Sequence, residues 1–467
     1  MIFPPQTSLI AVTVALVRFL ESTGATAWGS VYPYWYLGTT AYKFLIGPVI
    51  PIVASFIHNL YPGLSLFNVM IYIVAFSFVI SILGWSTLSF LISGNIKIAV
   101  IFGLILLIMP WRYFSAIAIN EASITIAKNL LPLTLIASWL YIQKRSITNA
   151  TMTILSISLV LLVNTDALPL LIVGLSSLVL ARGFKKGKVR FQKRTFKRIL
   201  LIIGASLLVV TLWYSPAYWM TILTNPSIGG VSGFRVIFRI FDFARAALPF
   251  LLAIVAVYFS GKIKSSLGVF ASIWVLTFLL LTIFRFLADW DFWMDWSLWM
   301  GEVEIGLGLL IVSNSRKVLG YLVLLTIPIL VVYFVYRAMG KPKLISNTVP
   351  EGVKSIDALA QSADDKLVFT SGATTFWLNA FYDTPQVRGG RDEVSDNAFW
   401  YKLAYEFREG KDLAKTQEWI EKTELKYILV HEQESDEYYH DFRYTDKWKE
   451  LGKVVWENEG DILYEIP

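Results

Sequence analysis

Long apolar stretches alternate with short polar ones over most of this chain. Ten nearly uncharged stretches, rich in Leu, Ile, Val and Phe, fill residues 64–337 of the 467 residues. An apolar helix crosses a bilayer because its own backbone satisfies every N–H and C=O group that lipid cannot. At roughly 20 residues a span, the pattern predicts a polytopic α-helical membrane domain of about 10–11 spans over residues 1–343.

The pattern changes after residue 343, where polar and acidic residues interrupt the apolar ones. Residues 344–467 are therefore expected to form a small soluble α/β domain. Two short buried strands are expected at 366–370 and 426–431, amphipathic helices at 397–407 and 412–424, and a terminal hairpin from 454–456 and 462–465.

The two parts carry opposite charge, which the net charge of +7 conceals. Residues 1–343 hold 27 Lys and Arg against 9 Asp and Glu, whereas residues 344–467 hold 14 against 25. The basic excess belongs to membrane-flanking loops, and no nucleic-acid-binding module is visible, so we expect no nucleic-acid partner. The chain has no cysteine, which excludes disulfides, thiolate metal sites and cysteine catalysis.

Basic loops predict the orientation in the membrane. Nine Lys and Arg fall within Arg182–Arg198, a segment that should therefore stay on the cytoplasmic side. Counting spans from this segment places the C-terminal domain on the outer side. The same count places five other segments there: residues 21–65, 111–125, 164–166, 218–243 and 287–297. The protein is expected to be a multi-pass protein of the cytoplasmic membrane with an extracytoplasmic C-terminal domain.

Carboxylates before residue 343 gather at the outer side. They are Glu21, Glu121, Asp166, Asp242, Asp289, Asp291, Asp295, Glu302 and Glu304. Carboxylates at a membrane boundary are costly unless they are solvated, paired or bound to a cation, so they are candidates for function. Asp166 equally suits a helix cap, and Asp289 and Asp291 equally suit a solvated loop. Glu302 and Glu304 lie inside an expected span, where Arg285 is a candidate partner.

Arginines and aromatic residues mark the same side. Arg235, Arg239 and Arg245 lie outside, against the usual charge bias, and suit either a donor phosphate or lipid headgroups. The outer aromatic residues, Trp35 and Trp293 among them, fit an interfacial belt or a sugar-binding surface. Trp35, Asp289, Asp291 and Trp293 are the candidate contacts to an acceptor or sugar.

Two segments resemble a known family. Residues 18–52, RFLESTGATAWGSVYPYWYLGTTAYKFLIGPVIPI, resemble the first outer loop of the GT-C membrane glycosyltransferases. Residues 119–130, INEASITIAKNL, are similar to the second-loop motif of the oligosaccharyltransferase catalytic subunit. The resemblance implies that Glu121 lies near a divalent metal and the donor phosphate. The family's acidic residue before the first-loop helix has no counterpart ahead of Glu21. Three explanations stay open: residues 8–20 are a short first span, Glu21 substitutes for that residue, or an upstream span with its Asp is missing from this chain. A WWDYG segment is absent, so peptide N-glycosylation is not expected.

The resemblance implies a membrane glycosyltransferase that moves a sugar from a polyprenyl-phosphate donor to a glycan, lipid or protein acceptor outside the cell. Glu121 and Glu21 are the expected catalytic residues. Glu121 and Asp166 are the expected ligands of Mg²⁺ or Mn²⁺, because hard cations prefer carboxylate oxygens. A lipid-linked sugar flippase and a catalytically inactive assembly subunit remain alternatives. A flippase would favour internal repeats and charged or polar residues at mid-membrane. No repeat is found in the sequence, and the carboxylates gather at one surface rather than midway.

Overall fold

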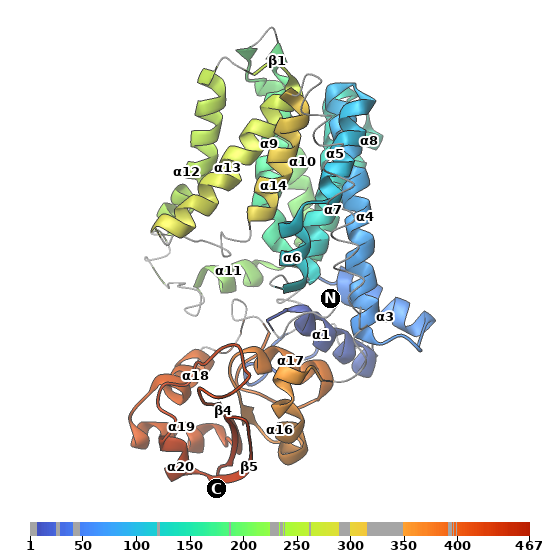
Figure 1. The fold of residues 1–467 in the computed structure, drawn as a ribbon. Helices are drawn as coiled ribbons and strands as arrows, with labels where there is room; N and C mark the ends of the chain where they lie inside the picture. Colours follow the sequence, from blue (N-terminus) through green and yellow to red (C-terminus); the bar gives the residue numbers. More distant parts are fainter. Residues whose placement is uncertain are drawn as a thin grey trace.

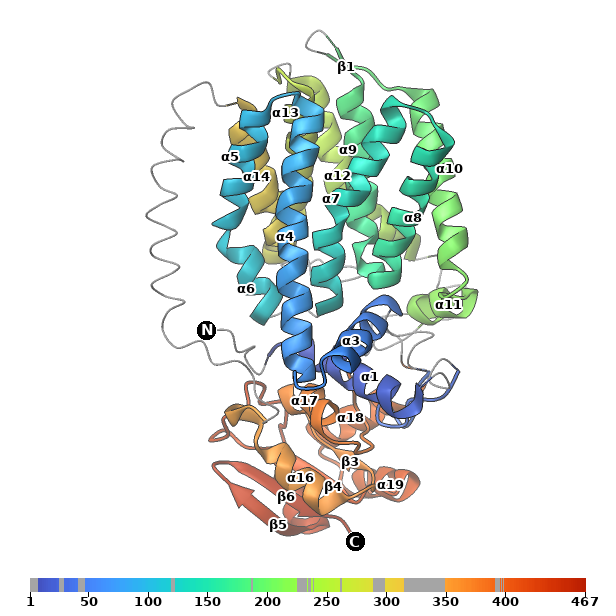
Figure 2. The ribbon, with the colours of Figure 1, turned by 90° about the vertical axis from the view of Figure 1, so that its right-hand side faces the viewer.

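The computed structural model describes residues 7–24, 29–40, 47–118, 122–185, 188–224, 233, 237, 239–260, 263–288, 299–314, 349–390, 395, 397 and 399–467. Within these residues the chain forms a helical bundle that adjoins a smaller α/β region at one end (Figure 1). The view turned by 90° shows the same two tiers (Figure 2).

Helices between residues 66 and 314 run alongside one another in the bundle (Figures 1 and 2). They are α4 (Leu66–Ser93), α5 (Ile96–Leu107), α7 (Ala122–Gln143), α8 (Ile147–Val163), α9 (Leu168–Arg182), α10 (Lys193–Val210), α12 (Arg239–Ser260), α13 (Ser266–Ala288) and α14 (Met300–Asn314). Four helical segments of the described residues are long and apolar enough to span a membrane, or five if one bent pair is a single span. The predicted helical membrane protein is confirmed, while the predicted total of about 10–11 spans stays a prediction because residues 315–348 are not described.

Capping residues set the helix boundaries inside the bundle. Ser65 and Ser146 each accept a hydrogen bond from the backbone N–H three residues later, at 3.2 and 3.1 Å, and so begin α4 and α8. Gly94 ends α4 with a φ of +70°, a conformation that glycine adopts without strain. Gly84 lets α4 approach α7 closely, since a Cβ there would lie 2.9 Å from Pro132 Cγ. These local features fix where the long helices pack.

Short elements occupy the two ends of the bundle. Next to the α/β region lie α1 (Ile10–Thr23), α3 (Val49–Leu60), α6 (Pro110–Ala118) and α11 (Pro216–Thr224), with the 3₁₀ turn η2 (Thr165–Ala167) between α8 and α9. The opposite end carries the small hairpin of β1 (Phe184–Lys185) and β2 (Lys188–Val189), inside the basic segment 182–198. Helix α1 packs on α3, α4 and α17 (Ala373–Phe381) rather than running through the bundle, so residues 8–20 are not a span.

The C-terminal region is a four-stranded sheet with helices, as predicted. Its strands are β3 (Val368–Phe369), β4 (Tyr427–His431), β5 (Lys453–Asn458) and β6 (Asp461–Glu465), in the order β3-β4-β6-β5. Strands β3 and β4 are parallel, and the other pairs are antiparallel. The helical elements are η6 (Glu351–Val353), α16 (Ser355–Ala363), α17, α18 (Trp400–Glu409), α19 (Leu413–Thr423) and α20 (Lys447–Leu451). The sequence pattern predicted α18, α19 and the hairpin β5–β6 but missed α16 and α17.

The C-terminal region packs tightly against the end of the bundle. Phe67, at the start of α4, stacks on Trp377 and Phe381 of α17 with ring centres 5.4 and 5.3 Å apart. Two backbone hydrogen bonds and one ion pair cross the same surface: Gln386 N–H to Tyr34 O at 3.0 Å, Tyr36 N–H to Arg388 O at 3.4 Å, and Arg18 Nη2 to Asp383 Oδ1 at 3.1 Å. We call this contact, between residues 10–67 and residues 373–400, the seam.

Trp35 lies at the centre of the seam. It is fully buried, with its ring centre 4.7 Å from that of Tyr32. Gly389 and Gly390 cover the indole so closely that a Cβ on Gly389 would lie 2.4 Å from Trp35 Cγ, and a Cβ on Gly390 2.8 Å from Cη2. Glycine at both positions is therefore required for this packing.

Candidate functional site

The bend between α5 and α6 forms one wall of a polar site at the end of the bundle. The two helices meet at 50°, and α6 begins at Pro110, which has no N–H to donate and a φ suited to a first helical position. The next two N–H groups, of Trp111 and Arg112, donate to the carboxylate oxygens of Glu304 on α14 at 3.2 and 3.3 Å. Glu304 thus caps α6 from another helix and fixes the position of Arg112.

Arg112 is buried among α4, α7 and α14, with 6% of its surface exposed. Its Nη2 donates to Ser81 Oγ at 2.7 Å and to Asn129 Oδ1 at 3.2 Å. Asn129 donates in turn to Ser77 Oγ at 2.9 Å. The Nη1 atom is buried and has no hydrogen-bond partner among the described residues. Because a buried charged donor is costly without an acceptor, this atom favours an acceptor that a ligand supplies.

Lys128 on α7 brings a second cation to the same place. Its Nζ lies 5.0 Å from the ring centre of Trp299, and the carboxylates of Glu302 and Asp166 act on its charge. Glu302 is 4% exposed, and its Oε2 has no hydrogen-bond partner within the described part of the chain. We call Arg112, Lys128, Asp166 and Glu302 the bundle-end cluster.

A small pocket lies between the two cations and Glu302. Its lining includes Arg112, Lys128, Asn129, Gly301 and Glu302, and it has room for about one water molecule. Such a space admits one oxygen atom of a charged group rather than a whole phosphate or sugar. Guanidinium and ammonium groups held side by side are the usual protein partners of a phosphate.

The described residues of this site do not form a metal-binding group on their own. Among them, no three His, Cys, Asp or Glu side chains come together in a group that could hold a metal ion. In the bundle-end cluster, the charges of Glu302 and Asp166 act on Lys128, and the charge of Arg112 acts on Glu302. The expected metal site of Glu121 and Asp166 stays a prediction, because Glu121 lies outside the described residues.

Two of the predicted carboxylates have well-defined surroundings. Glu21, near the end of α1, pairs with His58 of α3 through Oε1 and Nδ1 at 2.9 Å. Asp166 lies in the turn η2, where its backbone N–H donates to Asn164 Oδ1 at 2.7 Å, so Asn164 is the capping residue. The structure thus brings Asp166 into the bundle-end cluster and pairs Glu21 with a histidine of the neighbouring helix. Their catalytic and metal-binding roles stay predictions.

The other predicted site residues divide into two groups. Arg245 pairs with Asp242 within α12 at 2.9 Å, Arg239 begins that helix with its side chain undescribed, and Trp35 is buried in the seam. In this conformation Trp35 offers no surface to a sugar. The remaining candidates lie outside the described residues: Glu121, Arg235, Asp289, Asp291 and Trp293.

Sequence reasoning did not select Arg112 or Lys128. A signal was present, because both cations fall at the end of the bundle where the loops are otherwise poor in Lys and Arg. It also assigned Arg285 as the candidate partner of Glu302, whereas the cations that act on Glu302 are Lys128 and Arg112. The pairing of Glu302 with Lys128 and Arg112 depends on how three helices far apart in sequence pack together. The periodicity of one helix does not predict which other helix packs against it.

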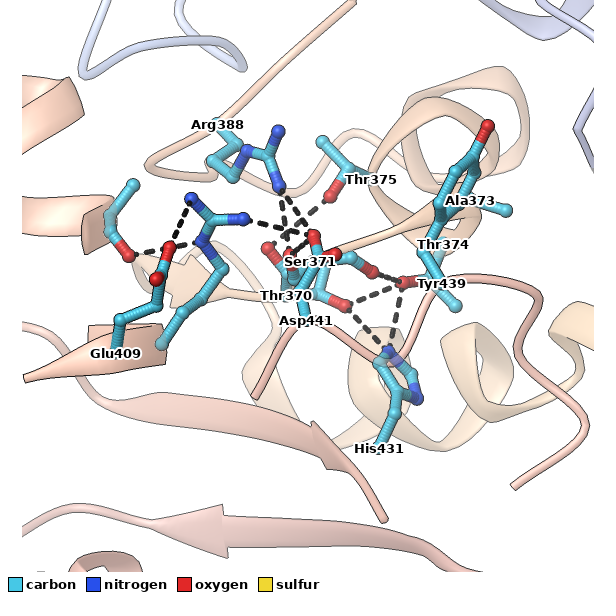
Figure 3. A network of polar contacts seen from close by, with 12 residues as sticks. Thr370, Ser371, Ala373, Thr374, Thr375, Arg388, Glu409, His431, Tyr439 and Asp441 are labelled. Atoms are coloured by element: carbon cyan, nitrogen blue, oxygen red, sulfur yellow. Dashed lines mark hydrogen bonds and ion pairs between the residues drawn. The ribbon is translucent and has the colours of Figure 1, made fainter. Parts of the chain in front are cut away.

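A second polar network lies in the C-terminal region (Figure 3). Asp441 Oδ2 accepts from Ser371 Oγ at 2.6 Å and from the Nη1 atoms of Arg408 and Arg388 at 3.0 and 3.4 Å. Burial alone would raise the pKa of Asp441, but the hydrogen bond from Ser371 and the two guanidinium charges lower it overall. Two arginines therefore share one carboxylate whose charged form they favour.

The buried end of this network is structural. His431 is 1% exposed, and its Nε2 is hydrogen-bonded with Thr374 and Thr370 (Figure 3). Its Nδ1 is bonded with Asp461 Oδ1 at 2.8 Å. Glu437 caps α17 by accepting from the N–H groups of Ala373 and Thr374 at 2.7 and 3.0 Å. These bonds tie α17 to the sheet and leave His431 without access to a substrate.

Comparison with known proteins supports the fold. No family model and no curated protein matches the sequence. The solved structure of arabinofuranosyltransferase AftD from Mycobacteria superimposes with a TM-score of 0.54 at 14% identity, over 99% of this chain and 38% of that one. The chain has the fold of the GT-C membrane glycosyltransferases.

Two structures of the Archaeoglobus fulgidus oligosaccharyltransferase are also similar. One is a complex with Zn and sulfate, with a TM-score of 0.49 and 13% identity over 90% of this chain and 63% of that one. The other is AglB in complex with an inhibitory peptide and a dolichol-phosphate. It has a TM-score of 0.45 and 15% identity, over 98% of this chain and 70% of that one. This chain thus spans between about a third and two thirds of the length of these enzymes.

Proposed function

We propose that this protein is a membrane glycosyltransferase that takes a sugar from a polyprenyl-phosphate donor and transfers it on the extracytoplasmic side. The observation that carries the proposal is the buried pair of cations, Arg112 and Lys128, at the end of the bundle that adjoins the C-terminal region. The GT-C fold and the glycosyltransferase activity of proteins with similar structures support the same kind of reaction. The acceptor is a glycan, lipid or protein.

The bundle-end cluster is suited to the leaving group of such a reaction. When the bond between sugar and phosphate breaks, negative charge develops on the departing phosphate. Arg112 Nη1 and Lys128 Nζ would donate to it in a buried, weakly screened setting, where charge-assisted hydrogen bonds are strong. Glu302 balances these cations before the donor binds, and Glu304 holds Arg112 in place through the start of α6.

The attacking acceptor needs a base, and the sequence resemblance assigns that role to Glu121, with Glu21 as the second candidate. Glu121 directly precedes α7, the helix that carries Lys128. Arg235, Arg239 and Arg245 remain proposed for the donor phosphate or the lipid surface. Asp289, Asp291 and Trp293 remain proposed contacts to acceptor or sugar, whereas Trp35 would reach one only if the seam opened. Mg²⁺ or Mn²⁺ is proposed at Glu121 and Asp166.

Binding of the donor's lipid phosphate tests the role of Lys128 without knowledge of the sugar. Full-length protein in lipid nanodiscs is titrated with polyprenyl phosphate and with the uncharged polyprenol, with native mass spectrometry as the readout. Lys128→Met should weaken polyprenyl-phosphate binding about 10- to 100-fold, the worth of a hydrogen bond to a charged group, and leave polyprenol binding unchanged. Lys97→Met, at the other end of the bundle, is the matched control.

Transfer itself is tested with Glu121→Gln. Release of polyprenyl phosphate from a panel of polyprenyl-phosphate sugars, with membranes of the source cell supplying the acceptor, should be lost in this variant. If Lys128→Met binds polyprenyl phosphate as tightly as Lys97→Met, the cluster is not the phosphate site. If Glu121→Gln transfers at the parental rate, Glu121 is not the base.

A further inference from the structure

A second and larger pocket lies in the C-terminal region, between α18 and α19. Its volume is about 500 Å³, which falls in the range of small-molecule sites. It is lined by Arg388, Trp400, Tyr401, Lys402, Ala404, Tyr405, Glu406, Arg408, Lys415 and Trp419. No role proposed above uses it.

Helix geometry explains why these side chains share one space. Tyr401, Tyr405 and Arg408 follow one another at spacings of four and three residues, so they form a stripe along one face of α18. Lys415 and Trp419 form the matching stripe on α19 at a spacing of four residues. The two stripes face each other across the pocket.

Among the pocket's aromatic residues, Tyr405 offers the most surface to a ligand, while Lys422 Nζ lies 4.7 Å from the ring centre of Trp419. Tyr405 is 54% exposed although its ring lines the pocket, while Tyr401 and Trp419 are half-buried. An apolar ligand would leave the hydroxyl groups and the charges of this surface without partners. Rings of Tyr and Trp beside polar groups instead suit a sugar, whose faces are apolar and whose rim carries hydroxyls.

The charge of the pocket is opposite to that of the region that holds it. Residues 344–467 carry a large acidic excess, yet four of the pocket's charged side chains are cationic and only Glu406 is acidic. Glu406 pairs with Lys415 at 2.8 Å. Asp441, which does not line the pocket, is shared by Arg388 and Arg408. Arg408 also lies 3.7 Å from Glu409. The carboxylates thus neutralise only part of the positive charge.

The pocket also adjoins the seam. The carbonyl of Arg388 accepts from the N–H of Tyr36 at 3.4 Å, and the ring of Trp400 packs on that of Tyr36 at 4.8 Å. Tyr36 belongs to the loop 29–40 at the end of the bundle. Both views place α18 on the side of the C-terminal region that faces the bundle (Figures 1 and 2). A ligand in this pocket is therefore held beside the membrane domain.

From these features we infer that the pocket between α18 and α19 binds a negatively charged saccharide. Arg388, Lys402 and Arg408 contact its anionic group, a carboxylate or a sulfate or phosphate ester, and Tyr401, Tyr405 and Trp419 pack on its sugar rings. Because the pocket lies at the seam, the bound saccharide is the acceptor or a charged unit of it, a role that rests on the proposed function.

Direct binding tests the inference separately from transfer. Full-length protein in nanodiscs is titrated by calorimetry with an oligogalacturonate, a neutral oligogalactose of equal length, a sulfated disaccharide, inorganic phosphate and a poly-glutamate peptide. The acidic saccharides should bind saturably, and the neutral one at least about tenfold more weakly. The oligogalacturonate and the sulfated disaccharide decide between a carboxylate and an ester as the charged group.

Four variants locate the site. Tyr405→Ala should weaken binding of the preferred acidic saccharide about tenfold, because an aromatic contact is lost, and Lys402→Gln about threefold, because an exposed charge is lost. Both side chains are exposed, so their replacement leaves the fold intact. Lys453→Gln, an exposed lysine on β5 outside the pocket, is the matched control and should bind as the parent does. Lys128→Met should also bind the saccharide normally, which separates this pocket from the donor site.

Four results would overturn the inference. These are no saturable binding of any acidic saccharide, equal binding of the neutral one, equal binding by inorganic phosphate or poly-glutamate, and Tyr405→Ala binding like Lys453→Gln. A protein that binds the acidic saccharide through this pocket but transfers no sugar keeps the binding site and refutes the glycosyltransferase proposal.

Discussion

Adding one methyl group at Gly389 should open the seam. The Cβ of Gly389→Ala would lie 2.4 Å from Trp35 Cγ, whereas ordinary contact begins at 3.4 Å, so the indole must move by about 1 Å. Trp35 is fully buried with Tyr32 packed against it, and no free space receives the ring. Overpacking of this kind costs about 1–3 kcal/mol, which raises the open population about 5- to 150-fold.

Hydrogen exchange measured by mass spectrometry reports this opening directly. The N–H groups of Tyr36 and Gln386 bond across the seam, so their exchange rates follow the open population. In Gly389→Ala, peptides covering these two amides should exchange about 5- to 150-fold faster, while peptides from α13 keep their protection. Gly63→Ala is the matched control, since nothing lies within 4 Å of a Cβ at that position.

A double variant separates the clash from other effects of the alanine. If the clash with the indole causes the opening, the double variant Gly389→Ala/Trp35→Leu should lose less stability at the seam than the sum of the losses in the two single variants. The reasoning is refuted if Gly389→Ala exchanges at the seam like Gly63→Ala, or if the costs of Gly389→Ala and Trp35→Leu simply add.

Three further changes test other parts of the structure. Glu304→Ala removes the acceptor of two N–H groups at the start of α6 and should cost about 1–3 kcal/mol, seen as faster exchange of α6 amides alone. Gly372→Ala should lower the melting temperature by several degrees, because φ is +74° there and a Cβ would lie 2.6 Å from Glu437 Oε1; an unchanged melting curve would contradict the cap geometry. Burial lowers the pKa of Lys447 from 10.5 to about 8, so the folded protein binds fewer protons than the unfolded chain between those values and gains stability as pH rises through them. The melting temperature of the parent should therefore rise relative to that of Lys447→Met between pH 8 and pH 10.5. A difference in melting temperature that does not change with pH would contradict the lowered pKa of Lys447.

The C-terminal region shows how far local pattern reaches. Short continuous apolar runs at 427–431 and 461–465 identify buried strands, and the apolar stripe on 413–423 identifies a helix, since one buried helix face imposes a period of 3.6 residues. Helix α17 was missed because residues 373–381 are buried on nearly every side, and such a segment has no polar face to reveal its period.

The candidate site shows where local pattern stops. The sequence indicated that carboxylates gather at one end of the membrane domain, and Asp166 does lie in the bundle-end cluster. It did not indicate that Arg112 would be held there by Glu304, or that Lys128 would meet Glu302, because each pairing joins helices nearly 200 residues apart.

By itself, the sequence determined that the chain is a helical membrane protein with an α/β region after it, because lipid and water each impose their own pattern on the segments they surround. Only the tertiary structure decided which charges meet, that α1 and the loop with Trp35 form the seam, and that cations and rings enclose a pocket in an acidic region. Those contacts depend on how side chains from segments distant along the chain fit together, and a hydropathy pattern contains no information on the shapes of side chains.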